Sequence, residues 1–283
     1  MTPRSKAELA LFSITFIWGS TFVTTKHLLD GISPFLYVGI RFGVAALLMA
    51  IVFRNSLKGL GRLTIMRGSV LGVLLFAGFI TQTIGLQYTT ASKSAFITGM
   101  MVVFTPICQL LIERRAPKWG NVAGIALVTV GLYFLTSPVG SEFNIGDALT
   151  LVCAAVFGLY IVYVDVFTKD HDAAQITLVQ FVVNSIFGGV AAAAFETTLF
   201  RTEPTYLLSL AYLAVFATVV AIYVQMKFQK DSTPTRSAVI FSIEPVIAAV
   251  FAYLVLGEVI GFLGIVGGGL ILAGLLVSEL SPA

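Results

Sequence analysis

Apolar residues fill ten long segments of this chain, and short polar stretches separate each segment from the next. The segments cover residues 9–28, 33–53, 64–86, 91–112, 118–136, 146–167, 173–195, 205–227, 235–256 and 259–278. A helix of about 20 apolar residues crosses the hydrocarbon core of a bilayer. A helix also satisfies its own backbone hydrogen bonds, which lipid cannot do. The pattern therefore predicts an all-α membrane protein with ten transmembrane helices.

The second half of the chain repeats the first. Matching positions lie 139 residues apart near the start of each half and 143 residues apart farther along. They pair Trp18 with Phe157, Gly19 with Gly158, Arg41 with Gln180, Lys93 with Arg236, Ser94 with Ser237, Gly124 with Gly267 and Gly131 with Gly274. Because each half holds five helices, an odd number, the halves would enter the membrane in opposite senses. The repeat predicts two inverted five-helix repeats, residues 1–140 and 141–283.

Composition supports the membrane class and argues against catalysis. The chain is 58% hydrophobic and 11% charged, whereas soluble domains average about 25% charged residues. Cys108 and Cys153 lie inside apolar segments, so we interpret them as small buried side chains rather than a disulfide or metal site. The sequence contains no phosphate-binding loop, nucleophile elbow or zinc-protease motif. We therefore expect no enzymatic activity, no cofactor and no metal. With a net charge of only +3, we also expect no nucleic-acid partner.

The distribution of Lys and Arg predicts the orientation. If the N-terminus is cytoplasmic, 13 of the 17 Lys and Arg residues fall in inside loops, 3 in outside loops and one, Arg41, within a span. Positively charged loops favour the cytoplasmic side of a membrane. We therefore expect a multi-pass protein of the cytoplasmic membrane, with both termini in the cytoplasm.

Two charged residues lie deep inside apolar segments, where a charge is costly and usually functional. Arg41 lies about eight residues from the outer end of its segment and Glu244 about nine from the inner end. At about 1.5 Å per residue, their heights would differ by roughly 6 Å, which long side chains can span. Three arrangements stay open: a structural ion pair, no contact, or a Glu244 that exchanges Arg41 for a proton or a cationic substrate. Pro106 and Pro245 are expected to bend their helices.

Several stretches resemble the drug/metabolite transporter superfamily, and within it the EamA-type exporters. They are WGSTFV at 18–23, GLQYTTASKSAFITGMMVVFTPI at 85–107 and SIEPVIAAVFAYLVLGEVIGFLGIVGGGLILAGLLV at 242–277. The resemblance covers the whole chain and implies ten helices in two inverted repeats around a central cavity. It implies substrate binding by Trp18, Thr21, Gln82, Tyr88, Thr98, Tyr160 and Gln225, with Glu244 as a further cavity residue. One departure is Glu113-Arg114-Arg115, where the second half has Gly257-Glu258.

These observations favour a secondary transporter that exports amino acids or related small metabolites through a central cavity by alternating access. One alternative is a sugar-phosphate or nucleotide-sugar carrier, which would need paired cations at mid-membrane. Another is a scaffold or lipid-handling protein without transport, although a scaffold would not need the polar residues inside the spans. Expected partners are a small-molecule substrate and the lipid bilayer. Protons as coupling ions, and a homodimer formed through the glycine-rich segments 118–136 and 259–278, stay open.

Overall fold

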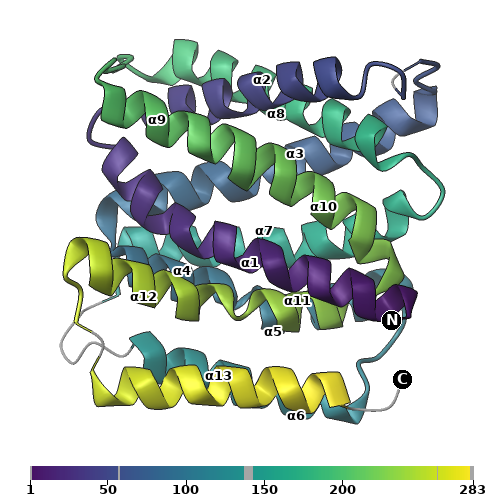
Figure 1. Ribbon diagram of the computed structural model, residues 1–283, viewed down its shortest axis with the longest axis vertical. Helices are drawn as coiled ribbons and strands as arrows, with labels where there is room; N and C mark the ends of the chain where they lie inside the picture. The colour runs from purple at the N-terminus through teal and green to yellow at the C-terminus, as the bar shows by residue number, and fades with distance from the viewer. Residues whose placement is uncertain (1, 57, 137–142, 260, 281–283) are drawn as a thin grey trace.

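The computed structural model describes residues 2–56, 58–136, 143–259 and 261–280. Its helices, labelled in Figure 1, are α1 (Pro3–Leu28), α2 (Pro34–Val52), α3 (Arg62–Tyr88), α4 (Ala91–Gly99), α5 (Met101–Glu113), α6 (Trp119–Thr136), α7 (Ile145–Thr168), α8 (Ala173–Phe195), α9 (Pro204–Tyr212), the π-helix η1 (Leu213–Val220), α10 (Ala221–Phe228), the 3₁₀ turn η2 (Gln229–Asp231), α11 (Pro234–Phe241), α12 (Glu244–Leu256) and α13 (Phe262–Leu280). Ile32 and Phe200 form an isolated antiparallel β-bridge.

Each predicted segment coincides with one helix or with a chain of consecutive helices. The segment 91–112 becomes α4 and α5, 205–227 becomes α9, η1 and α10, and 235–256 becomes α11 and α12. Eight spans within the described part of the chain are long and apolar enough to cross a membrane, and α6 and α13 contribute two shorter apolar helices. The prediction of an all-α membrane protein with about ten helices is therefore confirmed.

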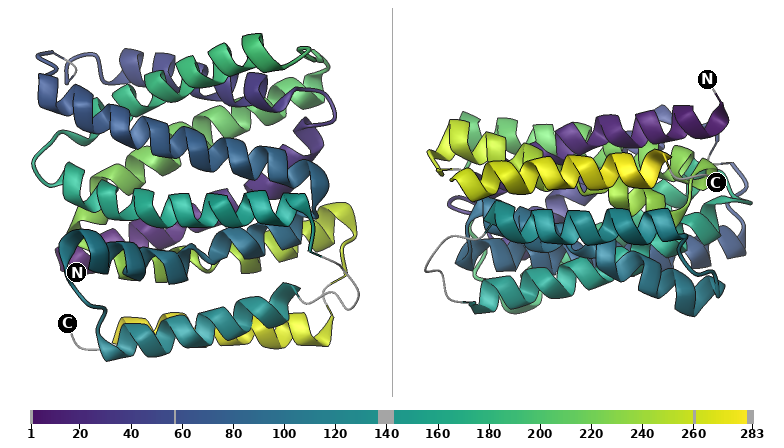
Figure 2. Two further views of the ribbon diagram at one scale, coloured as in Figure 1. Left: turned by 180° about the vertical axis from the view of Figure 1, so that it is seen from behind. Right: turned by 90° about the horizontal axis from the view of Figure 1, so that it is seen from below.

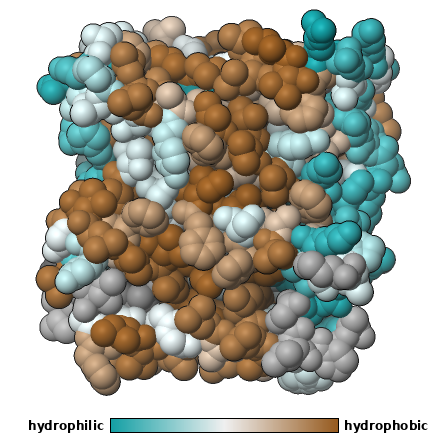
Figure 3. Space-filling model, viewed as in Figure 1, coloured by the Kyte–Doolittle hydropathy of each residue, from teal (hydrophilic) through white to brown (hydrophobic). Residues whose placement is uncertain are grey.

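The helices run along one common direction in two layers. One layer holds α9–α10, α1, α11–α12 and α13, and the other holds α3, α7, α4–α5 and α6 (Figures 1 and 2). The start of α1 and the end of α13 lie at the same end of the helices, here called the terminal end, and we call the other end the distal end. Hydrophobic residues cover the middle of the face in Figure 3, and hydrophilic residues gather most densely at the terminal end. This is the surface expected of a bilayer-spanning protein.

Glycines bring α6 and α13 together along their length. A Cβ atom placed on Gly124 would lie 2.7 Å from the carbonyl oxygen of Gly274, and one on Gly131 would lie 2.6 Å from that of Gly267. Only glycine permits such backbone contact between membrane helices. These glycines therefore pack the two helices within one chain.

A second set of contacts joins equivalent positions of the two halves. A Cβ atom on Gly19 of α1 would lie 2.6 Å from Cγ2 of Ile247 in α12, and one on Gly158 of α7 would lie 2.8 Å from Cβ of Phe104 in α5. Gly158 follows Gly19 by 139 positions and Ile247 follows Phe104 by 143. These are the paired contacts that an inverted repeat would make. The predicted boundary between residues 140 and 141 lies outside the described residues.

The departure at Arg114 does not change the backbone. Arg114 ends α5 in the left-handed conformation at φ 55°, and Gly257, its counterpart, ends α12 in the same conformation at φ 68°. A left-handed residue is a common way to end a helix, and it usually requires glycine. Arg114 therefore adopts the same turn as Gly257 in spite of its side chain.

Candidate functional site: a central cavity

Two of the long helices are interrupted near their centres, at equivalent places. The first break separates Gly99, at the end of α4, from Met101, and the second separates Phe241 from Glu244, at the start of α12. A Cβ atom on Gly99 would lie 2.8 Å from Cγ of Pro245, so the two interrupted helices pack against each other. Irregular backbone at membrane depth is tolerated only inside protein or beside a water-filled cavity. The breaks therefore indicate where a cavity can lie.

The two prolines have different places in these helices. Pro245 lies in the first turn of α12, where the helix needs no N–H group. Pro106 lies inside α5, six residues beyond the break at Met100. The interruption thus lies six residues before Pro106, and the bending expected at Pro106 itself stays a prediction. The first helix is interrupted where Gly99 packs closely against the second half.

A cavity surrounds the breaks. It is lined by Trp18, Thr21, Arg41, Leu75, Phe79, Gln82, Thr98, Met101, Phe157, Tyr160, Ile161, Ile222, Gln225, Phe241 and Glu244. These residues come from α1, α2, α3, α4, α5, α7, α10, α11 and α12. A mostly apolar cavity with a few polar groups is typical of a small-molecule site.

Most of the lining consists of equivalent positions from the two halves. At the offsets of 139 and 143, Trp18 pairs with Phe157, Thr21 with Tyr160, Phe79 with Ile222, Gln82 with Gln225, Thr98 with Phe241 and Met101 with Glu244. Only the glutamine pair keeps the same amino acid. The two halves thus contribute the same positions to the cavity but different chemistry.

The structure brings together all but one of the residues predicted to bind substrate. Trp18, Thr21, Gln82, Thr98, Tyr160 and Gln225 line this one cavity together with Arg41 and Glu244. Tyr88 does not, and 58% of its surface is exposed. It is the last residue of α3, six residues beyond Gln82, which places it about 9 Å farther along the helix axis. Tyr88 is therefore corrected from a cavity residue to an exposed residue at the distal end.

Arg41 is held on α2 by neutral groups. Its Nε donates to Oγ1 of Thr218 at 2.6 Å and its Nη1 donates to the hydroxyl of Tyr37 at 2.7 Å. Its Cζ lies 4.7 Å from the ring centre of Phe79, close enough for a cation–π interaction. The side chain is only 2% exposed, and among the described residues no carboxylate lies within 4.0 Å of it. These neighbours fix the orientation of the Arg41 guanidinium group but supply no negative charge to balance its positive charge.

The π-helix η1 supplies one of these neighbours. In η1 the hydroxyl of Thr218 donates to the carbonyl of Leu213 at 2.8 Å while it accepts from Arg41. Nε1 of Trp18 donates to the carbonyl of Ala217 at 3.0 Å. A π-helix widens the turn and often occurs at functional sites. Here it presents two backbone-anchored polar groups to residues that line the cavity.

Glu244 is the first residue of α12 and is 8% exposed. Within the described part of the chain, no hydrogen bond or ion pair reaches its carboxylate, and the sequence-based possibility of an ion pair with Arg41 is not realised. The N-terminus of α12 provides favourable partial positive charge for a carboxylate. The cavity therefore contains one cationic and one acidic side chain that do not neutralise each other by contact.

Other polar side chains of the lining are oriented by hydrogen bonds. The hydroxyl of Tyr160 donates to Oε1 of Gln180 at 2.9 Å, and Nε2 of Gln82 donates to Oγ1 of Thr98 at 3.1 Å. Tyr37 and Thr218, which orient Arg41, were missed by sequence reasoning. Tyr37 precedes Arg41 by one helical turn, a spacing that could have revealed it. No sequence signal marks Thr218, because its position depends on the π-helix.

Comparison with known proteins identifies the family. The sequence model of the EamA-like transporter family matches twice, over residues 5–137 and 144–280. A protein of Archaeoglobus fulgidus named an uncharacterized transporter is 36% identical over 98% of this chain and 87% of its own. The S-adenosylmethionine/S-adenosylhomocysteine transporter of Chlamydia muridarum is 23% identical over 89% of this chain and 85% of its own.

The fold is also that of a solved structure. A chain described only as a protein crystal structure superposes with a TM-score of 0.82 and 15% identity, and the match covers 98% of this chain and 97% of that one. At this identity the likeness concerns the fold alone. The family model covers both halves, and the relatives align along nearly the full chain. The chain belongs to the EamA-like transporter family and is a membrane transporter.

Proposed function

We propose that this transporter exports amino acids or related small zwitterionic metabolites from the cytoplasm through the central cavity by alternating access. The observation that carries the proposal is the presence of Arg41 and Glu244 in one cavity without contact between them. A zwitterion offers a carboxylate to the guanidinium, which favours two-pronged carboxylate binding. It also offers an ammonium group to the carboxylate. The substrate would then supply both missing partners.

Apolar and aromatic residues complete such a site. Trp18, Phe79 and Phe157 line the cavity between the polar groups. Aromatic rings contribute a large apolar area and attract cations over their faces. They would suit a substrate with an apolar side chain. The S-adenosylmethionine/S-adenosylhomocysteine transporter among the relatives supports this class, because both named compounds contain an α-amino acid group.

The transport mechanism follows from the proposed repeat. The family model matches each half separately, and the interrupted helices break at equivalent positions. Inverted repeats with broken helices at a central site are typical of transporters that alternate access. We further propose that residues 1–140 and 141–283 form these repeats, and that both termini lie in the cytoplasm, as the charged loops favour. Export would be driven by the substrate gradient or by protons.

A sugar-phosphate carrier fits the cavity less well. Among the described residues that line it, Arg41 is the only Lys or Arg. Lys93 and Arg236 each form an ion pair with a carboxylate. A doubly charged phosphate group would therefore meet one cation and one carboxylate in the cavity.

The experiment that tests the proposal is counterflow in proteoliposomes. Separate vesicles are loaded with an unlabelled amino acid, sugar phosphate or nucleotide sugar, and uptake of the matching radiolabelled compound is compared. We expect uptake of amino acids. Arg41→Gln should weaken binding by about tenfold or more, because a hydrogen bond to a charged group is worth about 1.5–3 kcal/mol. The exposed Tyr88→Phe serves as the matched control and should transport normally. Uptake of phosphate compounds alone would refute the proposal.

A further inference from the structure

Two buried ion pairs outside the cavity have the same design. In the first, Nζ of Lys93 lies 2.6 Å from Oδ2 of Asp147, whose side chain is 0% exposed. In the second, Nε of Arg236 lies 2.9 Å from Oε1 of Glu8, whose side chain is 9% exposed. Buried ion pairs are expensive to form, so they are weak evidence for a role in stability. Two of them in one small transporter therefore require an explanation.

The two pairs occupy equivalent positions of the two halves. Arg236 follows Lys93 by 143 positions, and Asp147 follows Glu8 by 139. Lys93 lies in the first turn of α4 and Arg236 in the first turn of α11. Both of these short helices end at the break of an interrupted helix.

The helix caps beside the cations repeat as well. The hydroxyl of Thr90 accepts from the backbone N–H of Lys93, and that of Thr233 accepts from the backbone N–H of Arg236. Thr233 also follows Thr90 by 143 positions. The two ion pairs therefore occur in the same local structure in both halves.

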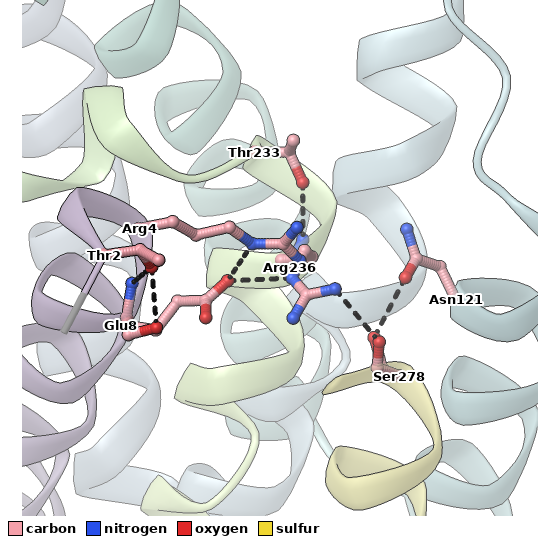
Figure 4. A network of polar contacts seen from close by, with 8 residues as sticks. Thr2, Arg4, Glu8, Asn121, Thr233, Arg236 and Ser278 are labelled. Atoms are coloured by element: carbon pink, nitrogen blue, oxygen red, sulfur yellow. Dashed lines mark hydrogen bonds and ion pairs between the residues drawn. The ribbon is translucent and has the colours of Figure 1, made fainter. Parts of the chain in front are cut away.

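Each pair joins one half to the other, at opposite ends of the molecule. Lys93, from the first half, meets Asp147 at the start of α7 at the distal end. Arg236, from the second half, meets Glu8 near the start of α1 at the terminal end, as Figure 4 shows. The cavity lies between them, because Thr98 follows Lys93 within α4 and Phe241 follows Arg236 within α11. The pairs therefore stand on either side of the cavity along the membrane normal.

We propose that these two ion pairs are the latches of the transporter. Lys93 and Asp147 hold the distal mouth of the cavity closed, and Arg236 and Glu8 hold the terminal mouth closed. One pair separates to open its mouth while the other stays joined. All four are positioning residues for transport, and none needs to touch the substrate. This inference rests on the proposed alternating access, although its test requires no substrate.

The surroundings of each pair suit a bond that opens and closes. Asp147 also accepts from the hydroxyl of Thr89 at 2.8 Å and from the backbone N–H of Asn144 at 2.9 Å, so its carboxylate keeps partners when Lys93 leaves. Glu8 likewise accepts from Nε of Arg4 at 2.9 Å. Nη1 of Arg236 donates to the carbonyl of Ser278 at 3.2 Å. These additional bonds lower the cost of an uncompensated charge in the open state.

Cysteine labelling in sealed vesicles tests the proposal. The background carries Cys108→Ala and Cys153→Ala, and Met101→Cys places a reporter in the cavity. A membrane-impermeant maleimide is added from one face at a time. Lys93→Gln with Asp147→Asn should increase the labelling rate from the distal face by about tenfold, a typical size for coupling between sites. Glu8→Gln with Arg236→Gln should produce a similar increase from the terminal face only.

Three controls separate a latch from general structural support. Lys93→Arg and Arg236→Lys keep the charge of each pair and should label as the background does. The ion pair between Lys169 and Asp165 lies within four residues at the end of α7 and does not join the halves. Lys169→Gln with Asp165→Asn should therefore leave labelling from both faces unchanged.

Several results would overturn the inference. One is that the two pair variants fold but label as the background does; another is that each becomes accessible from both faces alike. If a neutral variant does not fold, the charge-exchanged variant Lys93→Asp with Asp147→Lys, or Glu8→Arg with Arg236→Glu, is measured in its place. Failure of these to fold would show a purely structural role. A different result separates this inference from the proposed substrate. If each pair variant labels faster from the expected face but the unaltered protein takes up no amino acid, only the proposed substrate is contradicted.

Discussion

The two interrupted helices have the same backbone but different chemistry. α4 and α5 break at Met100, and α11 and α12 break at the equivalent Ile243. The residue after the first break is Met101 and the residue after the second is Glu244, and both line the cavity. One half thus contributes a flexible apolar side chain where the other contributes a carboxylate. Helix geometry is shared by the halves, whereas the carboxylate directly after the break is present in the second half alone.

The neighbouring helices show the same contrast. α3 is a regular α-helix, but its counterpart in the second half contains the π-helix η1. Leu75 of α3 corresponds to Thr218, the acceptor for Arg41. A repeat can therefore keep its helices and their packing while a short segment in one half is altered to hold a polar side chain.

The largest effect is expected from Glu244→Gln, which keeps the shape of the side chain and removes its charge. If protons drive export, gradient-driven uptake should fall by about a hundredfold or more while substrate exchange continues, because exchange needs no net proton movement. Uptake and exchange in proteoliposomes measure both. Met101→Gln is the matched control in the other half and should leave the coupling intact. Unchanged gradient-driven transport in folded Glu244→Gln protein would eliminate the coupling role.

The equivalent glycines should respond alike to substitution. Gly19→Val and Gly158→Val should each destabilise the fold by about 1–3 kcal/mol, because a larger side chain would overlap Ile247 or Phe104. Melting temperatures in detergent measure this loss. Gly269→Val is the control, since no atom of the described residues outside the local helix backbone lies within 4 Å of a Cβ atom there. A large loss at Gly19 alone would show that the halves do not pack equivalently.

Thr218→Val tests the π-helix as the support of Arg41. The change removes the acceptor of Arg41 Nε and keeps the volume of the side chain nearly constant. Substrate affinity should fall by about tenfold, because a hydrogen bond to a charged group is worth about 1.5–3 kcal/mol and part is recovered from water. Leu75→Val, at the equivalent position of α3, should have a smaller effect on affinity. Equal affinities for the Thr218→Val and unaltered proteins, measured by binding in detergent, would show that Thr218 does not orient Arg41.

The smallest effect concerns the residues that end α5 and α12. Arg114→Gly should stabilise the protein by up to about 1 kcal/mol, because glycine adopts a left-handed conformation without steric cost. Gly257→Ala should destabilise it by a similar amount. A pair of melting temperatures checks both signs. A destabilised Arg114→Gly would mean that contacts of the arginine side chain outweigh the strain of its backbone.

The positions of the spans and the internal repeat were determined by the sequence itself. The length of apolar segments is set by the thickness of the bilayer, so the ten helices could be located without a structure. The offsets of 139 and 143 positions also predicted which residues correspond. Had they been applied to acidic residues, they would have matched Glu8 with Asp147 before any contact was known.

Only the tertiary structure decided which of these residues meet. The break at Met100, the π-helix at Thr218 and the separation of Arg41 from Glu244 depend on how several helices pack around one cavity. Tyr88 illustrates the limit, because the family resemblance implied that it lies in the cavity, whereas the structure leaves it exposed and outside the lining. Hydropathy indicates how well each single helix suits a lipid environment. A contact between two helices inside the membrane depends on the rotation and the height of both helices.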